Sequence, residues 1–142
     1  MTDLAVLTEQ DREFLRRPLH GFLSVAAGPV PAQPRPVWFE ATDSGTVELF
    51  TTPDAAKVER LRRDPRASIV VAAPVGERER WVAVSGRTTI EPDGAHALAQ
   101  RLAARYWDLD DPGRAGQLAE ILADDGLLRV VIHPEQVRRY TF

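Results

Sequence analysis

The sequence predicts a mainly β fold with peripheral helices, in which six to seven largely antiparallel strands form one barrel. Polar and apolar residues alternate along Thr46–Thr51, the pattern of a strand with one buried face. The turn residues Asp43–Gly45 precede it, as in a β-hairpin. Strands joined by hairpins run antiparallel, and closing their sheet into a barrel removes its exposed edges. The 142 residues suffice for one core, so residues 1–142 are predicted to form one domain.

The N-terminal half is expected to hold a helix, three strands and a second helix. Thr8 is expected to cap the first helix, and Pro18 to stop it. The strands are expected at Gly21–Ala26, Pro36–Ala41 and Thr46–Thr51. The second helix is expected from about Pro53 to Arg63, with Thr52 as its cap, because proline is favourable at the first helical position.

The C-terminal half is expected to alternate between strands and helices. A buried strand is predicted from an apolar run, and a long strand with a bend near Gly86 follows it. Two helices and two final strands complete the order. These elements are Ala67–Ala73, Arg80–Ile90, a helix capped by Asp93 that runs to about Trp107, a helix at Arg114–Ala123, and strands at Leu127–His133 and Val137–Phe142.

Composition excludes several classes of protein. The net charge of −3 gives no long-range attraction to nucleic acid or to an anionic membrane. The absence of cysteine excludes disulfides and thiolate metal sites. No stretch approaches the ~18 apolar residues of a membrane span. Met1–Gln10 carries acidic residues and no basic one, so no signal peptide is expected and the expected location is the cytoplasm.

Lys57 is the only lysine among the 18 Lys and Arg residues. Codon bias in a G- and C-rich genome explains the scarcity of lysine, but the position of this one is informative. It falls in the first turn of the helix that follows Phe50-Thr51-Thr52, where free N–H groups and the helix dipole favour an anion. Two hydroxyl groups and an ammonium at this point form a candidate phosphate site, and the alternative is a capped helix with a solvated lysine.

Other chemistry-bearing patterns are scarce. The three histidines have no companion at metal-ligand spacing, so no metal site is expected. No nucleophile motif, dinucleotide fingerprint or Walker loop is present, and no catalytic residue is named. Trp38 and Phe39 are neighbours on a strand and therefore face opposite sides, one toward the core and the other toward a flat cofactor or a dimer interface. A cofactor that carries the chemistry itself suits this set of residues.

Residues 35–86 resemble the split β-barrels of the pyridoxamine 5′-phosphate oxidase type, which include flavin- and deazaflavin-dependent oxidoreductases. The matching text is Arg-Pro-Val-Trp-Phe-Glu from Arg35, Phe-Thr-Thr-x4-Lys from Phe50, Leu-Arg-Arg-Asp-Pro-Arg-Ala-Ser-Ile-Val from Leu61, and Arg-Trp-Val-x3-Gly from Arg80. The run Lys-x3-Leu-x2-Asp-Pro-Arg is the most specific part. The resemblance implies an FMN-binding split β-barrel that forms a homodimer with two cofactor sites at the interface.

The resemblance also implies site residues. Arg35 opens the matching motif, and the strand Val37, Trp38 and Phe39 corresponds to the one that lines the flavin ring. Thr51, Thr52 and Lys57 fall on positions that hold the ribityl phosphate. Trp81 falls where relatives often have a glutamine near the ring.

Two departures from the family pattern bear on the cofactor. True pyridoxamine-phosphate oxidases place further basic residues around the phosphate, where this chain has Ala56 and Glu40. Fewer cations suit the singly charged phosphodiester of coenzyme F420 better than the phosphomonoester of FMN. Arg60, Arg62 and Arg63 are expected to attract the acidic tail of F420.

The sequence therefore predicts a cytoplasmic oxidoreductase that uses F420 for hydride transfer to a small conjugated acceptor. An FMN-dependent oxidase or reductase of the same fold is the first alternative. The second is a non-enzymatic protein that binds flavin or haem, with His20, His96 and His133 as the candidate haem ligands.

Overall fold

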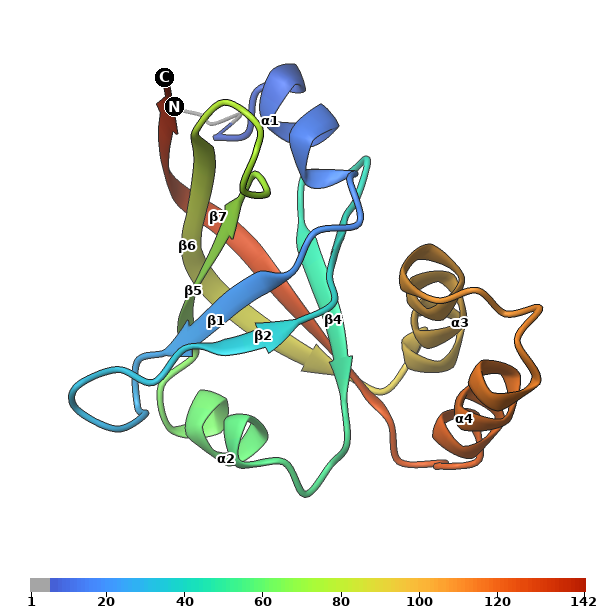
Figure 1. Ribbon diagram of the computed structural model, residues 1–142. Helices are drawn as coiled ribbons and strands as arrows, with labels where there is room; N and C mark the ends of the chain where they lie inside the picture. Colours follow the sequence, from blue (N-terminus) through green and yellow to red (C-terminus); the bar gives the residue numbers. More distant parts are fainter. Residues whose placement is uncertain (1–5) are drawn as a thin grey trace.

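The computed structural model describes residues 6–142 and shows one curled sheet with four helices around it (Figure 1). The seven strands follow the order β2-β1-β5-β6-β7-β4-β3, and every neighbouring pair is antiparallel. Their bounds are β1 Gly21–Val25, β2 Arg35–Val37, β3 Glu40–Ala41, β4 Val47–Thr51, β5 Arg66–Ala72, β6 Arg80–Glu91 and β7 Leu128–Thr141. The predicted mainly β fold is confirmed.

The two edges of the sheet come from one short stretch of chain. Strands β2 and β3 lie at opposite ends of the strand order, yet only Trp38 and Phe39 separate them. Three Cα–Cα steps span at most about 11 Å, so the sheet has to curl until its edges approach each other. The predicted strand Pro36–Ala41 was therefore wrong as a continuous element, because its two halves pair with different partners, β1 and β4.

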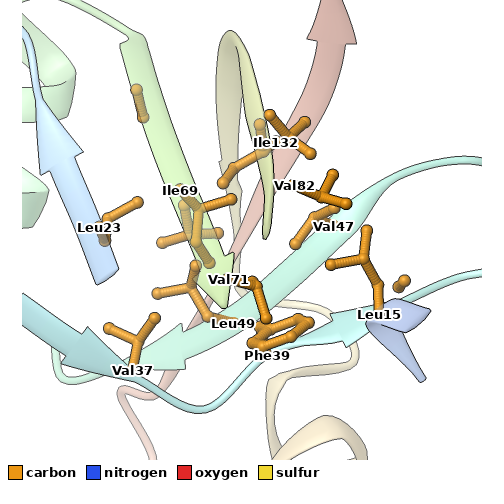
Figure 2. Packing of buried hydrophobic residues seen from close by; sticks show 14 of the residues in the cluster. Leu15, Leu23, Val37, Phe39, Val47, Leu49, Ile69, Val71, Val82 and Ile132 are labelled. Carbon is orange, nitrogen blue, oxygen red and sulfur yellow. The ribbon is translucent and has the colours of Figure 1, made fainter. Parts of the chain in front are cut away.

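The interior of the curled sheet holds the main core. Alternate residues of β1, β4, β5 and β6 point inward, including Leu23, Leu49, Ile69 and Val82 (Figure 2). Phe39 is fully buried among them, so the side chain that follows Trp38 in the chain belongs to the core. This inward position of Phe39 leaves its neighbour Trp38 on the other side of the chain.

The helices cover the ends and one flank of the barrel (Figure 1). Helix α1 (Glu9–Leu15) begins with a capping box in which Thr8 and Asp11 bond each other's backbone N–H groups, which confirms Thr8 as its cap. Helix α2 (Ala56–Arg63) closes the opposite end, and α3 (Ala95–Tyr106) and α4 (Pro112–Leu122) lie side by side beyond β4.

Helices α2 and α3 begin without the side-chain caps that were predicted for them, and α4 begins two residues before the predicted Arg114. Helix α2 begins three residues later than expected, with Ala55 in the cap position and no side-chain cap, while the carbonyl of Thr52 accepts the N–H of Ala55. Helix α3 is preceded by Gly94 at φ +81° rather than capped by Asp93, whose carbonyl accepts a bond of 2.8 Å from Arg129 Nε. Lys57 remains in the first turn of α2.

The last two predicted strands are one strand. Strand β7 runs without a break from Leu128 to Thr141 and pairs with β6 along its length. The register shifts between Ser85, which faces Gln136, and Gly86, which faces Pro134, so Glu135 is the extra residue of a β-bulge. This irregularity lies where a bend near Gly86 was predicted, and the predicted gap before Val137 was wrong.

Candidate functional site

Three pockets form a row, in which each pocket shares a lining residue with the next. The first, called here the cationic pocket, has a volume of about 380 Å³ and lies between α2 and the loop that joins β1 to β2. The second, the aromatic pocket, measures about 330 Å³ and is lined by Trp38 and Phe50. The third, the acidic pocket, measures about 400 Å³ and lies under α4. Lys57 lines the first two pockets, and Phe50 lines the second and third.

Lys57 is partly buried at the junction of the cationic and aromatic pockets. Burial lowers the pKa of its ammonium group, because the charged form is separated from water. Within residues 6–142, Lys57 takes part in no ion pair and no acidic side chain lines the cationic pocket. A desolvated cation without a counter-ion at the start of a helix favours the binding of an anion.

Two arginines join Lys57 around the cationic pocket. Arg35 comes from β2, and Arg60 lies on α2 close to one turn after Lys57. The pocket therefore holds more positive charge than was assumed when few cations around the phosphate were taken to favour F420. Glu40 does not reduce this positive charge, because its carboxylate accepts bonds of 2.9 and 3.0 Å from Arg101.

Trp38 is the centre of an aromatic cluster that the sequence did not predict. Its ring stacks on Tyr106 with centroids 5.1 Å apart and meets Trp107 edge-on at 4.7 Å. Phe50 lies 6.4 Å from Trp38, and His20 lies 5.9 Å from Tyr106. The pair Tyr106-Trp107 at the end of a helix was the available signal, but only the fold brings it to Trp38.

Tyr106 is also hydrogen-bonded to the backbone of two segments, at Leu19 and at Phe39. Its hydroxyl donates to the carbonyl of Leu19 at 2.6 Å and accepts the N–H of Phe39 at 3.4 Å. Burial raises the pKa of this hydroxyl, so it stays protonated and remains a donor. Helix α3 thereby fixes the indole wall of the aromatic pocket.

The predicted site residues separate into two groups. Arg35, Val37, Trp38 and Lys57 line the cationic or the aromatic pocket. Thr52 lines the acidic pocket instead, and Thr51 and Phe39 are buried, Phe39 completely. Trp81 lies on the outer face of β6, where it stacks on Tyr140 with centroids 6.1 Å apart. Trp81 is therefore outside the row of pockets in the single chain.

The described part of the chain holds no cluster of metal-ligating side chains and no helix that could span a membrane. Across residues 6–142, no group of three or more His, Cys, Asp or Glu side chains is arranged to hold a metal ion. No helix in that range has both the length and the apolar character needed to cross a bilayer. The first half of the Met1–Gln10 segment, on which the expected location rests, lies outside the described residues.

Comparisons with known proteins match the fold described here. The family model of pyridoxamine 5′-phosphate oxidase matches residues 7–139. An F420 reductase structure is 24% identical, with 93% of this chain and 98% of that chain covered and a TM-score of 0.72. A conserved hypothetical protein from Mycobacterium tuberculosis is 22% identical, with 99% and 90% covered and a TM-score of 0.70. An FAD-binding protein from Mesorhizobium loti is 20% identical, with 96% of both chains covered and a TM-score of 0.64.

These likenesses to solved structures concern the fold. No curated protein matches the sequence.

Proposed function

Because the chain belongs to the pyridoxamine 5′-phosphate oxidase family of split barrels, we propose that it is an oxidoreductase that binds a flavin-type cofactor. Coenzyme F420 is the first candidate and FMN the second. The proposed reaction is hydride transfer to a small conjugated acceptor. When bound, the cofactor supplies the redox chemistry, and the chain's own residues bind it, orient it and keep water from the ring.

One observation carries the proposal: a pocket with three cations shares Lys57 with a pocket that has aromatic walls. Flavins and deazaflavins join a flat ring to a phosphate group, and this pair of pockets fits both parts. Lys57, Arg35 and Arg60 are the residues that would hold the phosphate. Trp38, Phe50 and His20 would surround the ring.

The distribution of charge on α2 favours F420 over FMN. Arg62 and Arg63 continue the positive charge of Arg60 along the exposed side of the same helix. In the described chain, neither Arg62 nor Arg63 pairs with an acidic side chain. F420 carries an acidic tail beyond its phosphodiester, whereas FMN ends at its phosphate, so only F420 would use these two arginines.

We further propose a homodimer that completes the cofactor site. The outer face of the sheet exposes two cross-strand pairs of large apolar side chains, Phe22 opposite Val70 and Trp81 opposite Tyr140. Exposed large apolar side chains on one face of a sheet favour a protein–protein interface. In such a dimer Trp81 would reach the partner's site, a role that stays a prediction.

Reconstitution tests the proposed function directly. The purified chain is titrated with FMN and with F420, and binding is followed by the distinct absorption bands of the flavin and deazaflavin rings. We expect F420 to bind more tightly, with a Kd below about 100 μM, or roughly −5.5 kcal/mol. If neither cofactor binds in this range, the proposed function is wrong. If FMN binds more tightly, the alternative of an FMN-dependent enzyme replaces it.

A further inference from the structure

The acidic pocket under α4 differs in charge from the other end of the row. Two acidic residues line it, Glu120 on α4 and Asp124 just after that helix, and the carboxylate of Asp124 also accepts the N–H of Gly126 at 2.8 Å. No basic side chain of the described chain lines the pocket. The cationic pocket has the opposite character, with three basic side chains. The lining of the row therefore changes from basic side chains in the cationic pocket, through aromatic ones in the aromatic pocket, to acidic ones in the acidic pocket.

Apolar groups form the rest of the acidic pocket. Phe50, Trp107, Ile121 and Leu127 line it, and they come from β4, from the end of α3, from α4 and from the segment before β7. Its volume of about 400 Å³ lies within the range of pockets that hold small ligands. Carboxylates beside aromatic rings are the arrangement that favours an organic cation, since both the charge and the ring faces attract it.

Beside the pocket, a cation already lies on the ring of Trp107. The guanidinium of Arg114 lies over this ring at 4.7 Å, and it donates a bond of 3.1 Å to Gln117, which lines the pocket. Arg114 does not line the pocket itself. Glu120 makes no hydrogen bond or ion pair within residues 6–142, so its charge is available to a ligand.

We propose that the acidic pocket binds a small organic cation with a flat apolar body. The apolar body would be buried between Phe50 and Trp107, and the positive charge would face Glu120 and Asp124. Because Phe50 also lines the aromatic pocket, such a ligand would lie next to the proposed cofactor ring. In that position the bound cation would be the hydride acceptor. This second assignment rests on the proposed function, whereas the binding of the cation to the chain does not.

The test uses three water-soluble probes of similar size and different charge. Benzyltrimethylammonium, benzyl alcohol and benzoate are titrated into the cofactor-free full-length chain by calorimetry. We expect the cation to bind most tightly and benzoate least tightly. A neutral probe that binds as tightly as the cation would overturn the proposal.

Substitutions locate the site. Glu120→Gln should weaken binding of benzyltrimethylammonium about two- to fivefold, the range for an exposed charge pair. Arg114→Ala should strengthen it, because a competing positive charge is removed. Asp125→Asn is the matched control, since Asp125 is exposed and adjacent to Asp124 but does not line the pocket. Equal effects of Glu120→Gln and Asp125→Asn would place the cation elsewhere and refute the proposal.

A final measurement separates the ligand site from the acceptor's position. Benzyltrimethylammonium is added to the chain loaded with F420 or FMN, and the absorption of the bound ring is recorded. A change that Glu120→Gln diminishes supports the position beside the ring. Cation binding without any change in the ring's spectrum would refute the acceptor assignment, and failure of both cofactors to load would refute the proposed function alone.

Discussion

The rings of Trp38 and Tyr106 stack with centroids 5.1 Å apart and with only 4° between their planes. Trp38 lies at the crossing between the two edge strands of the sheet, and Tyr106 is the last residue of α3. The stack therefore joins the helical flank to the seam of the barrel. Since Trp38 also lines the aromatic pocket, the shape of that pocket depends on a helix far away in the sequence.

Two substitutions of Tyr106 separate its ring from its hydroxyl. Tyr106→Phe removes the bond to the Leu19 carbonyl and should lower the free energy of unfolding by about 1–2 kcal/mol, with little effect on cofactor affinity. Tyr106→Leu also removes the stack, worth about 0.5–1.5 kcal/mol, and should weaken cofactor binding. Urea unfolding and cofactor titration measure both effects. Equal loss of cofactor affinity in the two variants would show that the stack does not position Trp38.

Lys57→Met should weaken binding of the cofactor by about 1.5–3 kcal/mol, the range for a hydrogen bond to a charged group. The apolar stem of the side chain is kept, so the change isolates the ammonium group. Arg62→Met is the matched control in the FMN titration, because Arg62 lies on the same helix, is exposed and does not line the cationic pocket, and FMN lacks the acidic tail proposed for Arg62. Titration with FMN measures both variants. An affinity that Lys57→Met leaves unchanged would mean that the phosphate binds elsewhere.

The pKa of Lys57 makes cofactor affinity depend on pH. Burial lowers this pKa below the ordinary 10.5 in the free chain, and a bound phosphate raises it again. Affinity is then greatest below the lowered pKa and falls as pH rises through it, because the neutral amine has to take up a proton on binding. Calorimetry with FMN across the alkaline range measures this fall. Lys57→Arg should abolish it, and a fall of the same size in that variant would assign it to another group.

The sequence predicted the strands well where a local pattern of residues determines their bounds. It predicted them less well where the bounds depend on which strand is the pairing partner. The alternation of polar and apolar residues predicted β4, and the turn residues predicted its hairpin. The run Pro36–Ala41 contains no signal that its two halves form opposite edges of the sheet and pair with β1 and β4. Helix-start chemistry identified Lys57 as a candidate. The same reasoning could not predict that Arg60 lines the pocket with Lys57, because this depends on how α2 packs against the loop after β1.

The aromatic side chains show the same limit. Alternation predicted that Trp38 and Phe39 face opposite sides but not which of them is buried. It likewise separates Trp81 from Val82 without saying which one faces the core, and the fold puts Trp81 outside. Tyr106 and His20 are distant from Trp38 in the sequence, so only the tertiary structure assembles this cluster.

The ion pair between Asp11 and Arg139 joins α1 to the end of β7 and should contribute to acid stability. Asp11 is buried and accepts bonds of 3.1 and 2.8 Å from Arg139. Burial alone would raise the pKa of Asp11, but the bonds from Arg139 and Thr8 outweigh it and lower the pKa below 3.8. This contribution is complete above pH 3.8 and is lost as pH falls through the lowered pKa.

Asp11→Asn should therefore lower the free energy of unfolding at neutral pH by about 1–2 kcal/mol, since Arg139 is half exposed and partly solvated. The difference from the wild type should shrink in strong acid. Asp43→Asn is the control, because Asp43 is exposed and its contact with Arg16 is 3.4 Å long. Urea unfolding at several pH values measures both variants, and a pH-independent effect of Asp11→Asn would contradict the assignment.

Two glycines should respond in opposite directions to the same substitution. A Cβ atom on Gly86 would lie 1.9 Å from the carbonyl oxygen of His133, so the bulge between β6 and β7 has no room for a side chain. Gly86→Ala should lower the free energy of unfolding by about 1–3 kcal/mol, the cost of forcing the backbone apart.

Gly116 lies inside α4, and a Cβ there meets nothing within 4 Å. Gly116→Ala should raise stability by about 0.5–1 kcal/mol, because alanine loses less backbone entropy in a helix. Urea unfolding of both variants measures the contrast. A Gly86→Ala chain as stable as the wild type would show that β6 and β7 approach less closely than described.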